Sequence, residues 1–340
     1  DVRTTKWTTP FYLQIVLSFL SREPFSSQYH IKNEYIDVLR LTLTNEKPDL
    51  VHCEWTNLAP FLEYVEDIPC IISSHNVESD IWKRLGKNGS NIFMRILGRS
   101  QAIKIERLER HWYPRADCCI AVSNQDMETI SSYGANVTVV DNGVDIGYYD
   151  SYPKQRIRKS SIVFTASFDT FSNQDGAIYF IEEIYPLIKK EVPDVQVWLV
   201  GKNPPDKLKS YSSVDTSIHV TGTVEDVRAY IAQAEICIVP LRIGGGSRLK
   251  ILEAMAMKKP VVSTTVGAEG LSVEHGKNIF LADTPESFKD YVIRFLRDQT
   301  VRENIAESGY NLVKERYDWE NLAMKHAMIW NDLIISSRKE

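Results

Sequence analysis

Short apolar runs alternate along this chain with longer segments in which apolar residues recur at helical spacing. The runs read as buried strands at residues 50–53, 70–73, 118–122 and 137–141, and then at 161–166, 195–200, 218–220, 236–240 and 261–264. Helical patterns separate them at about 31–45, 57–66, 91–113, 124–133 and 174–191, and helices are predicted throughout 285–335. Strands and helices that alternate in this way form parallel sheets covered by helices, so the sequence predicts an α/β fold.

A polar segment over residues 150–160 divides the strands into two series. Its sequence, DSYPKQRIRKS, is basic and contains a proline, as is typical of an interdomain linker. With 340 residues and 43% hydrophobic content, the chain can fill two cores of ordinary size. The sequence therefore predicts domains over 1–150 and 151–317, followed by a C-terminal helical segment over 318–340.

Charge and cysteine content narrow the class of protein. The net charge of −5 provides no global basic field, so we expect no nucleic-acid partner. The five cysteines lie mainly in strand-like runs without a C-x-x-C pair, which indicates buried thiols in a reducing compartment. Residues 11–20, FYLQIVLSFL, are too few to span a bilayer and precede no small-residue cleavage site, so we expect an amphipathic helix there.

The stretch 244–271 places a glycine loop, a helix start, a buried strand and a second glycine loop in immediate succession. Its sequence is GGGSRLKILEAMAMKKPVVSTTVGAEGL. Gly244, Gly245 and Gly246 lack Cβ atoms, so backbone N–H groups there can approach a ligand closely. Ser247 can cap the following helix, whose N-terminus adds partial positive charge. This order of elements predicts a phosphate-binding site.

Charged side chains in the first turns of the same helix suit such a ligand. Arg248 and Lys250 supply full positive charges, and Glu253 lies on the side of Lys250, where it can accept hydrogen bonds from a vicinal diol such as a ribose. A flexible turn with a solvated Lys–Glu pair is the alternative, but the buried strand that follows places the loop where ligands collect in α/β folds. The loop matches neither G-K-[ST] nor G-x-G-x-x-G, so ATP and NAD fit less well.

At these residues the chain resembles the group 1 glycosyltransferases, a family of retaining, nucleotide-sugar-dependent enzymes with the GT-B fold. In that family a Glu-x7-Glu motif opens onto L-E-A-M-A and then P-V-V, which LEAMAMKKPVVST matches closely. The resemblance makes Glu253 the ribose-binding carboxylate and includes Leu249 in the donor loop. The first glutamate falls on Gly245, as in members with a G-G-G-[ST]-R-L-K loop, so donor-sugar recognition relies more on backbone groups or other residues.

The resemblance also implies an architecture. A GT-B enzyme has two Rossmann-like parallel-sheet domains that face a central cleft, and its C-terminal helices cross back to the first domain. The first domain is then the acceptor side, 151–317 binds the donor, and 318–340 returns to the first domain. The family's N-terminal strand and glycine-rich turn are not found, so we expect this chain to lack the first strands. NGVD at 142–145 matches the family's turn at the domain junction.

Other candidates for the same site follow strand ends. His75 closes the strand IISSH where the resemblance places a histidine near the transferred sugar, and Asn76 follows it. Glu54 is a second acceptor-side candidate, while Gly201 and Lys202 follow the strand VQVWLV and are expected to wall the nucleotide. A structural histidine and ordinary loop residues are the alternatives at these positions.

The loop after the first strand of the second domain departs from the family. Many members hold the diphosphate there with an Arg and a Lys, but FTASFDTFSNQDG contains neither. Asp169 and Asn173 occupy that neighbourhood, so the phosphate charge is expected to fall to Arg248 and Lys250.

The expected reaction is retaining transfer of a hexose-type sugar from a nucleoside diphosphate to a hydroxyl acceptor, in cell-surface polysaccharide or glycolipid assembly. The glycine-loop N–H groups, Arg248 and Lys250 would stabilise the leaving diphosphate. No DxD-like cluster lies in a suitable loop, so we expect no metal and no other cofactor. A GT-B-fold sugar-nucleotide epimerase and a non-catalytic sugar-nucleotide-binding protein are the alternatives.

Basic residues gather between residues 82 and 115. Nine Lys or Arg side chains stand there against only Glu106 and Glu109, with apolar residues interleaved. Such a segment can lie on an anionic membrane surface, where each basic residue contributes on the order of 1 kcal/mol. A solvated face, or a groove for a phosphorylated acceptor, is the alternative. We expect a cytoplasmic enzyme at the inner face of the membrane, with a saccharide or lipid-linked acceptor.

Overall fold

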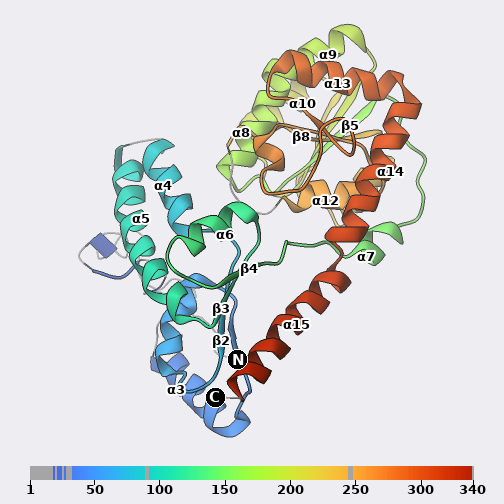
Figure 1. Ribbon diagram of the computed structural model, residues 1–340. Helices are drawn as coiled ribbons and strands as arrows, with labels where there is room; N and C mark the ends of the chain where they lie inside the picture. The colour runs from blue at the N-terminus through green and yellow to red at the C-terminus, as the bar shows by residue number, and fades with distance from the viewer. Residues whose placement is uncertain are drawn as a thin grey trace. The chain divides into compact units, whose positions relative to one another are not determined.

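The computed structural model describes residues 18–19, 21–24, 27, 33–88, 92–243 and 248–338. The chain forms two compact units, the first made of Asp1–Asp141 and Met324–Glu340 and the second of Asn142–Ala323 (Figure 1). Most of the amphipathic helix predicted at 11–20 lies outside the described residues. Within the described part of the chain, no helix is both long and apolar enough to cross a bilayer.

The described part of the first unit is built on a parallel sheet. Its strands lie in the order β1-β2-β3-β4, with bounds Val51–Cys53, Cys70–Ser74, Cys118–Ala121 and Val137–Val139. The helices around it are α3 (Asn33–Glu46), η1 (Thr56–Tyr64), α4 (Glu78–Asn88), α5 (Ile92–Trp112), η2 (Tyr113–Arg115) and α6 (Asn124–Ser131). The four predicted strands are confirmed. Pro60 lies inside the segment predicted as a helix at 57–66, which is a 3-10 helix.

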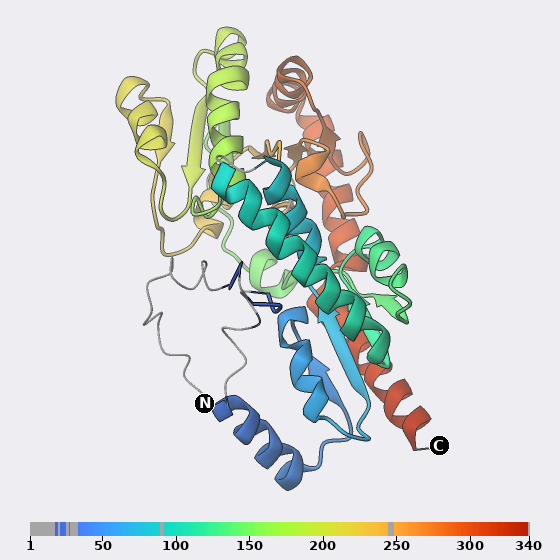
Figure 2. The same cartoon turned by 90° about the vertical axis from the view of Figure 1, so that its left-hand side faces the viewer.

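Helices α4 and α5 pack side by side through two glycines (Figure 2). A Cβ atom at Gly98 would lie 2.4 Å from the backbone nitrogen of Gly86, so only glycine permits this close approach. Helix α5 was predicted at 91–113, whereas α4 was missed because few of its residues are apolar.

The second unit contains a six-stranded parallel sheet in the order β10-β9-β8-β5-β6-β7. The strands, from β5 to β10, are Ser161–Thr165, Gln196–Val200, Ile218–Val220, Ile236–Val239, Val261–Ser263 and Phe280–Leu281. Five of them were predicted, and β10 is too short to give a periodic signal. Ile162, Phe164, Val197 and Leu199 are fully buried, as expected of strands covered on both faces.

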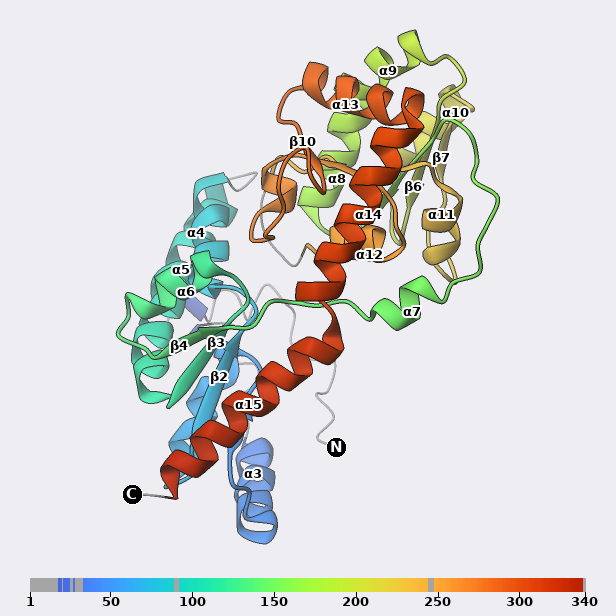
Figure 3. The same cartoon turned by 45° about the vertical axis from the view of Figure 1, so that its right-hand side comes forward.

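Helices cover both faces of that sheet. The helices of this part of the chain are α7 (Ile146–Asp150), α8 (Phe171–Tyr179), α9 (Tyr185–Glu191), α10 (Asp206–Val214), α11 (Arg228–Gln233), α12 (Leu249–Ala256), α13 (Pro285–Arg297) and α14 (Gln299–Arg316). Helix α15 (Trp319–Ser337) follows them and begins in the second unit. The helix predicted at 174–191 is α8 and α9 joined by a π-helical turn, Phe180–Ile184. Helix α14 packs against α12 (Figure 3). The short helices α7, α10 and α11 were missed.

The units divide after Asp141, earlier than the predicted division after residue 150. Val144 and Ile146 are buried in the core of the second unit, and the segment predicted as a linker also belongs to it. There the backbone N–H of Arg158 donates to the backbone carbonyl of Gln233 at 2.8 Å. The guanidinium of Arg158 lies 4.1 Å from the centre of the Trp198 ring. These contacts attach Arg158 to the second unit.

The C-terminal helix α15 joins the two units in sequence. From Met324 onward its residues belong to the first unit, whereas the sequence placed the return at 318. There the indole N–H of Trp330 donates to Nδ1 of His52 at 3.1 Å, and Arg338 pairs with Asp49 at 2.8 Å. These contacts attach the end of the chain to β1 and the residues before it.

Candidate active site

Helix α12 begins at Leu249, and Arg248 occupies the N-cap position before it. Gly244, Gly245, Gly246 and Ser247 lie outside the described residues, so the predicted glycine loop and serine cap stay predictions. Leu249 is half-buried and packs against the core of the second unit. The described part of this junction therefore presents Arg248, Lys250 and Glu253 from the first turns of α12.

Arg248 is bound by the second glycine loop. Its Nη2 lies 3.0 Å from Oε2 of Glu269, and its Nε donates to the carbonyl of Glu269 at 3.3 Å. The arginine is only 7% exposed, while Glu269 lies just after the 3-10 turn Val266–Ala268. The sequence motif included both glycine loops, but it did not predict which carboxylate pairs with Arg248.

Lys250 lies against the carboxyl end of β5. Its Nζ donates to Oδ1 of Asn173 at 2.7 Å and lies 4.9 Å from the centre of the Phe164 ring. Asn173 is oriented in turn by a 2.7 Å hydrogen bond from its Nδ2 to the carbonyl of Ser167. Burial, aided by the charge of Arg248 and opposed by that of Glu253, lowers the pKa of Lys250 to about 8.

Glu253 interacts with Lys250 and with a residue that the sequence did not reveal. Burial raises the pKa of Glu253, while the nearby hydroxyl of Tyr149 and the charge of Lys250 lower it. The Lys250–Glu253 spacing thus places the two charges on one side of α12, as predicted. Two cations and a half-buried carboxylate that lie together can bind a diphosphate and a diol.

Gly201 and Lys202 connect the loops after β5 and β6. A Cβ atom at Gly201, whose φ is +149, would lie 1.7 Å from the carbonyl oxygen of Ala166, so this position requires glycine. The backbone carbonyl of Lys202 accepts from the backbone N–H of Phe168 at 3.0 Å. Nζ of Lys202 pairs with Asp169 at 3.2 Å. These contacts give both residues a structural role, whether or not they also wall a nucleotide.

In the first unit, Glu54 lies between two histidines. Its Oε2 is 3.6 Å from Nε2 of His75, and its Oε1 is 3.7 Å from Nε2 of His52. Glu54 and His75 are both exposed, at the carboxyl ends of β1 and β2. The carbonyl of Asn76 accepts from the Ser74 hydroxyl at 2.7 Å. The structure thus brings together the two acceptor-side candidates that the sequence placed on different strands.

His52 was not predicted as part of this group. Because the Trp330 indole can only donate, Nδ1 of His52 accepts, and the ring proton lies on Nε2, 2.6 Å from the Ser73 hydroxyl. Burial lowers the pKa of His52, so the neutral ring is favoured. Trp330 stands 278 positions away along the chain, and no local pattern could have identified it.

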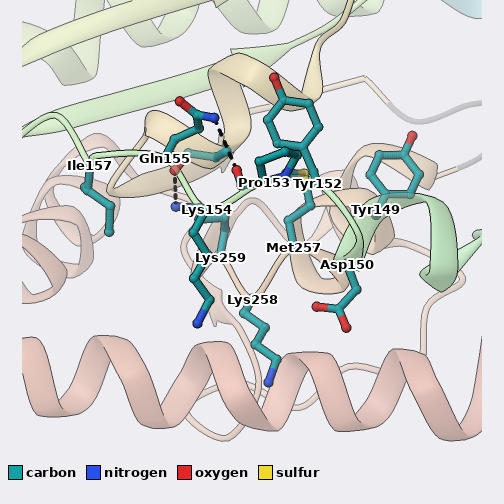
Figure 4. A pocket seen from close by; sticks show the side chains of 11 residues that line it. Tyr149, Asp150, Tyr152, Pro153, Lys154, Gln155, Ile157, Met257, Lys258 and Lys259 are labelled. Carbon is teal, nitrogen blue, oxygen red and sulfur yellow. Dashed lines mark hydrogen bonds between the residues drawn. The ribbon is translucent and has the colours of Figure 1, made fainter.

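A separate pocket of about 250 Å³ lies between the 149–157 segment and residues 257–259 (Figure 4). Three of its charged groups contact protein atoms: Nζ of Lys259 donates to two backbone carbonyls, Lys258 pairs with Glu307, and Asp150 accepts from Tyr310. None of the predicted site residues lines it. We assign no ligand to this pocket.

Comparison with known proteins identifies the class of enzyme. Residues 159–298 match the family described as "Glycosyl transferases group 1", and residues 4–148 match "Glycosyltransferase Family 4". This chain is a glycosyltransferase. The glycosyltransferase is 23% identical over 289 residues to an "Uncharacterized 44.6 kDa protein in cps region" of Klebsiella pneumoniae, covering 82% of this chain and 74% of the relative.

Solved structures show that the glycosyltransferase has the GT-B fold. Sucrose-phosphate synthase from Thermosynechococcus elongatus superimposes with a TM-score of 0.68 at 16% identity, covering 89% of this chain and 78% of the other. HepE of Anabaena, solved in complex with UDP, gives 0.66 at 16% identity, covering 87% and 82%. The two family matches favour glycosyl transfer over the epimerase and the non-catalytic binding protein.

Proposed function

We propose that this enzyme transfers a hexose-type sugar from a nucleoside diphosphate donor to a hydroxyl acceptor with retention at the anomeric carbon. The observation that carries the proposal is the cluster on α12, where Arg248 and Lys250 lie beside the half-buried carboxylate of Glu253. The two cations suit a diphosphate, and the carboxylate suits the ribose hydroxyls. The similar structure of HepE was solved with UDP, which makes UDP the first nucleotide to test.

The difficult step is departure of the nucleoside diphosphate, which develops negative charge. Arg248 and Lys250 stabilise that charge from fixed positions, together with the N-terminus of α12. A bound diphosphate favours the protonated form of Lys250, whose pKa is lowered to about 8 by burial in the free enzyme. The acceptor hydroxyl attacks from the face that the diphosphate leaves, and a phosphate oxygen takes its proton. This mechanism requires no carboxylate nucleophile and no metal ion.

On the acceptor side, His75 contacts the transferred sugar or the incoming hydroxyl, and Glu54 holds the imidazole at 3.6 Å. Asn76 adds polar groups next to it. The product belongs to cell-surface polysaccharide or glycolipid assembly, a proposal supported by the similarity to a protein named for a cps region.

Helix α5 supports a location at the inner face of the membrane. Its exposed side chains mix apolar and basic residues, namely Ile92, Phe93, Arg95, Ile96, Arg99, Ile103 and Arg107. Apolar side chains can enter the interface between lipid head groups and tails while arginines contact anionic head groups. A lipid-linked acceptor would then be presented at the surface to which the enzyme binds.

Calorimetric titration of UDP, GDP and ADP, and then of their hexose conjugates, tests the donor site. We expect one nucleotide to bind the wild type, and both Arg248→Ala and Glu253→Ala to weaken its binding. Failure of all three nucleotides to bind the folded wild-type protein would contradict the proposal.

A further inference from the structure

We propose that Trp330 on α15 holds His52 as the neutral tautomer with its proton on Nε2, and thereby positions the carboxylate of Glu54 on the acceptor side. A neutral His52 leaves that carboxylate free to pair with His75. The inference rests on the proposed function, in which His75 contacts the transferred sugar or the incoming hydroxyl. Trp330 and His52 are positioning residues, because they act on the substrate through other side chains. All four residues belong to the first unit.

The hydrogen bonds of His52 define one tautomer. The indole N–H of Trp330 donates to Nδ1 of His52 at 3.1 Å, so Nδ1 uses its lone pair and cannot carry a proton at the same time. Nε2 carries the proton and donates to the Ser73 hydroxyl at 2.6 Å. Protonation of Nδ1 would break the bond to Trp330. The His52 side chain is only 12% exposed, so water cannot readily replace that bond.

Glu54 lies between two imidazoles at nearly equal distances. Its Oε1 is 3.7 Å from Nε2 of His52, and its Oε2 is 3.6 Å from Nε2 of His75. Both distances exceed the length of an N–H···O hydrogen bond, so each attraction depends on the charge of the ring. A protonated His52 would compete strongly for the carboxylate, because water screens a mostly buried charge less than the exposed His75. A neutral His52 removes this competition.

The other titratable groups around His52 also influence its charge. Burial lowers the pKa of His52, and the carboxylate of Glu54 opposes this effect. Positive charge on either neighbouring ring, His326 or His75, would lower it further. The ring centre of His326, also on α15, lies 5.9 Å from that of His52, and burial lowers the pKa of His326 as well. Trp330 acts in the same direction as burial, and a single substitution can remove its contribution.

The experiment compares the wild type with Trp330→Phe, which keeps an aromatic ring on α15 but removes the indole N–H. Proton–nitrogen correlation NMR with isotope-labelled histidine reports the tautomer and charge of His52, whose signals are assigned by their absence in His52→Gln. We expect the Nε2–H tautomer in the wild type. In Trp330→Phe, His52 should take up its second proton at a pH about one unit higher, because one hydrogen bond to the neutral ring is lost. Trp319→Phe, which changes another exposed tryptophan of the same helix, is the matched control.

Turnover provides the functional measurement. It is followed as the nucleoside diphosphate released from UDP-, GDP- and ADP-hexoses with water as the acceptor. In Trp330→Phe, turnover should fall roughly three- to tenfold at about pH 6, where His52 becomes charged, and should match the wild type at about pH 8. Nucleotide affinity should equal that of the wild type at both pH values.

Three results would overturn the inference and leave the donor site unaffected. An Nδ1–H tautomer in the wild type would contradict the proposed hydrogen bonds of His52. An equal loss of turnover at both pH values would show that Trp330 only supports the fold. Unchanged turnover at about pH 6 would show that the charge of His52 does not influence His75. If His75→Ala keeps wild-type turnover, the acceptor-side part of the proposed function fails, and the inference fails with it.

Discussion

Arg248 and Glu269 form an ion pair that joins the helix after the first glycine loop to the second glycine loop, with Nη2 and Oε2 3.0 Å apart. The arginine is 7% exposed, so its charge depends on nearby protein groups rather than on bulk water. A diphosphate bound at the start of α12 would compete with Glu269 for this guanidinium. The pair therefore bears directly on donor affinity.

Replacing Glu269 with Gln should strengthen nucleotide binding by about tenfold, or 1.4 kcal/mol, because the carboxylate no longer competes for Arg248. The free energy of unfolding should fall by about 1–2 kcal/mol without ligand, because a mostly buried cation loses its partner. Calorimetry and chemical denaturation measure the two effects. Glu307→Gln, which breaks the exposed pair with Lys258, is the control. Weaker binding in Glu269→Gln would mean that Glu269 positions Arg248 for the donor.

Lys250 should make nucleotide binding pH-dependent. Burial lowers its pKa to about 8 in the free enzyme, so it is mostly charged at pH 7 and loses its proton as the pH rises through 8. Affinity for the nucleoside diphosphate should therefore fall above pH 8. Lys250→Met should remove this decline and reduce turnover by about 10²–10³-fold. A variant with the same decline would assign it to another group.

His75→Ala should reduce sugar transfer by about 10²-fold or more while leaving nucleotide affinity unchanged, because His75 belongs to the acceptor side. Steady-state transfer kinetics and calorimetry of the nucleotide separate these effects. His111→Ala changes an exposed histidine at the end of α5 and serves as the control. Equal loss of nucleotide binding would place His75 in the donor site instead.

Membrane binding should depend on the exposed apolar side chains of α5. The wild type should sediment with phosphatidylglycerol vesicles, and added salt should weaken this binding. The double variant Phe93→Asp, Ile96→Asp should not sediment with the vesicles. Phosphatidylcholine vesicles should retain little protein. Phe171→Asp changes an exposed aromatic residue of the second unit and should sediment like the wild type. Vesicle binding that survives the double variant would exclude this face of α5.

Gly98→Ala should lower the free energy of unfolding by about 1–3 kcal/mol, because the new methyl group would meet the backbone of Gly86. Chemical denaturation measures the change. Gly147→Ala, where a Cβ atom meets only an Asp145 oxygen at 3.4 Å, should be nearly neutral. Equal stability of the two variants would show that α4 and α5 separate at little cost.

Local pattern was enough to predict most of the architecture. Buried parallel strands are continuous apolar runs, so nine of the ten described strands could be located from sequence. Lys250 and Glu253 are three residues apart on one helix, and helical geometry alone makes them neighbours. The two-residue strand β10 and the short helices α7 and α11 contain too few residues to show a period.

The partners of the site residues were decided by tertiary structure. Each of these partners comes from another part of the chain. Glu269 pairs with Arg248, Asn173 accepts from Lys250, Tyr149 lies near Glu253, and Trp330 donates to His52. Whether a segment forms a helix or a strand shows in the spacing of apolar residues within that segment, so the sequence reveals it. A side chain's hydrogen-bond partner and its pKa depend on which distant segments pack against it, and only the folded arrangement of the sheets and helices determines that.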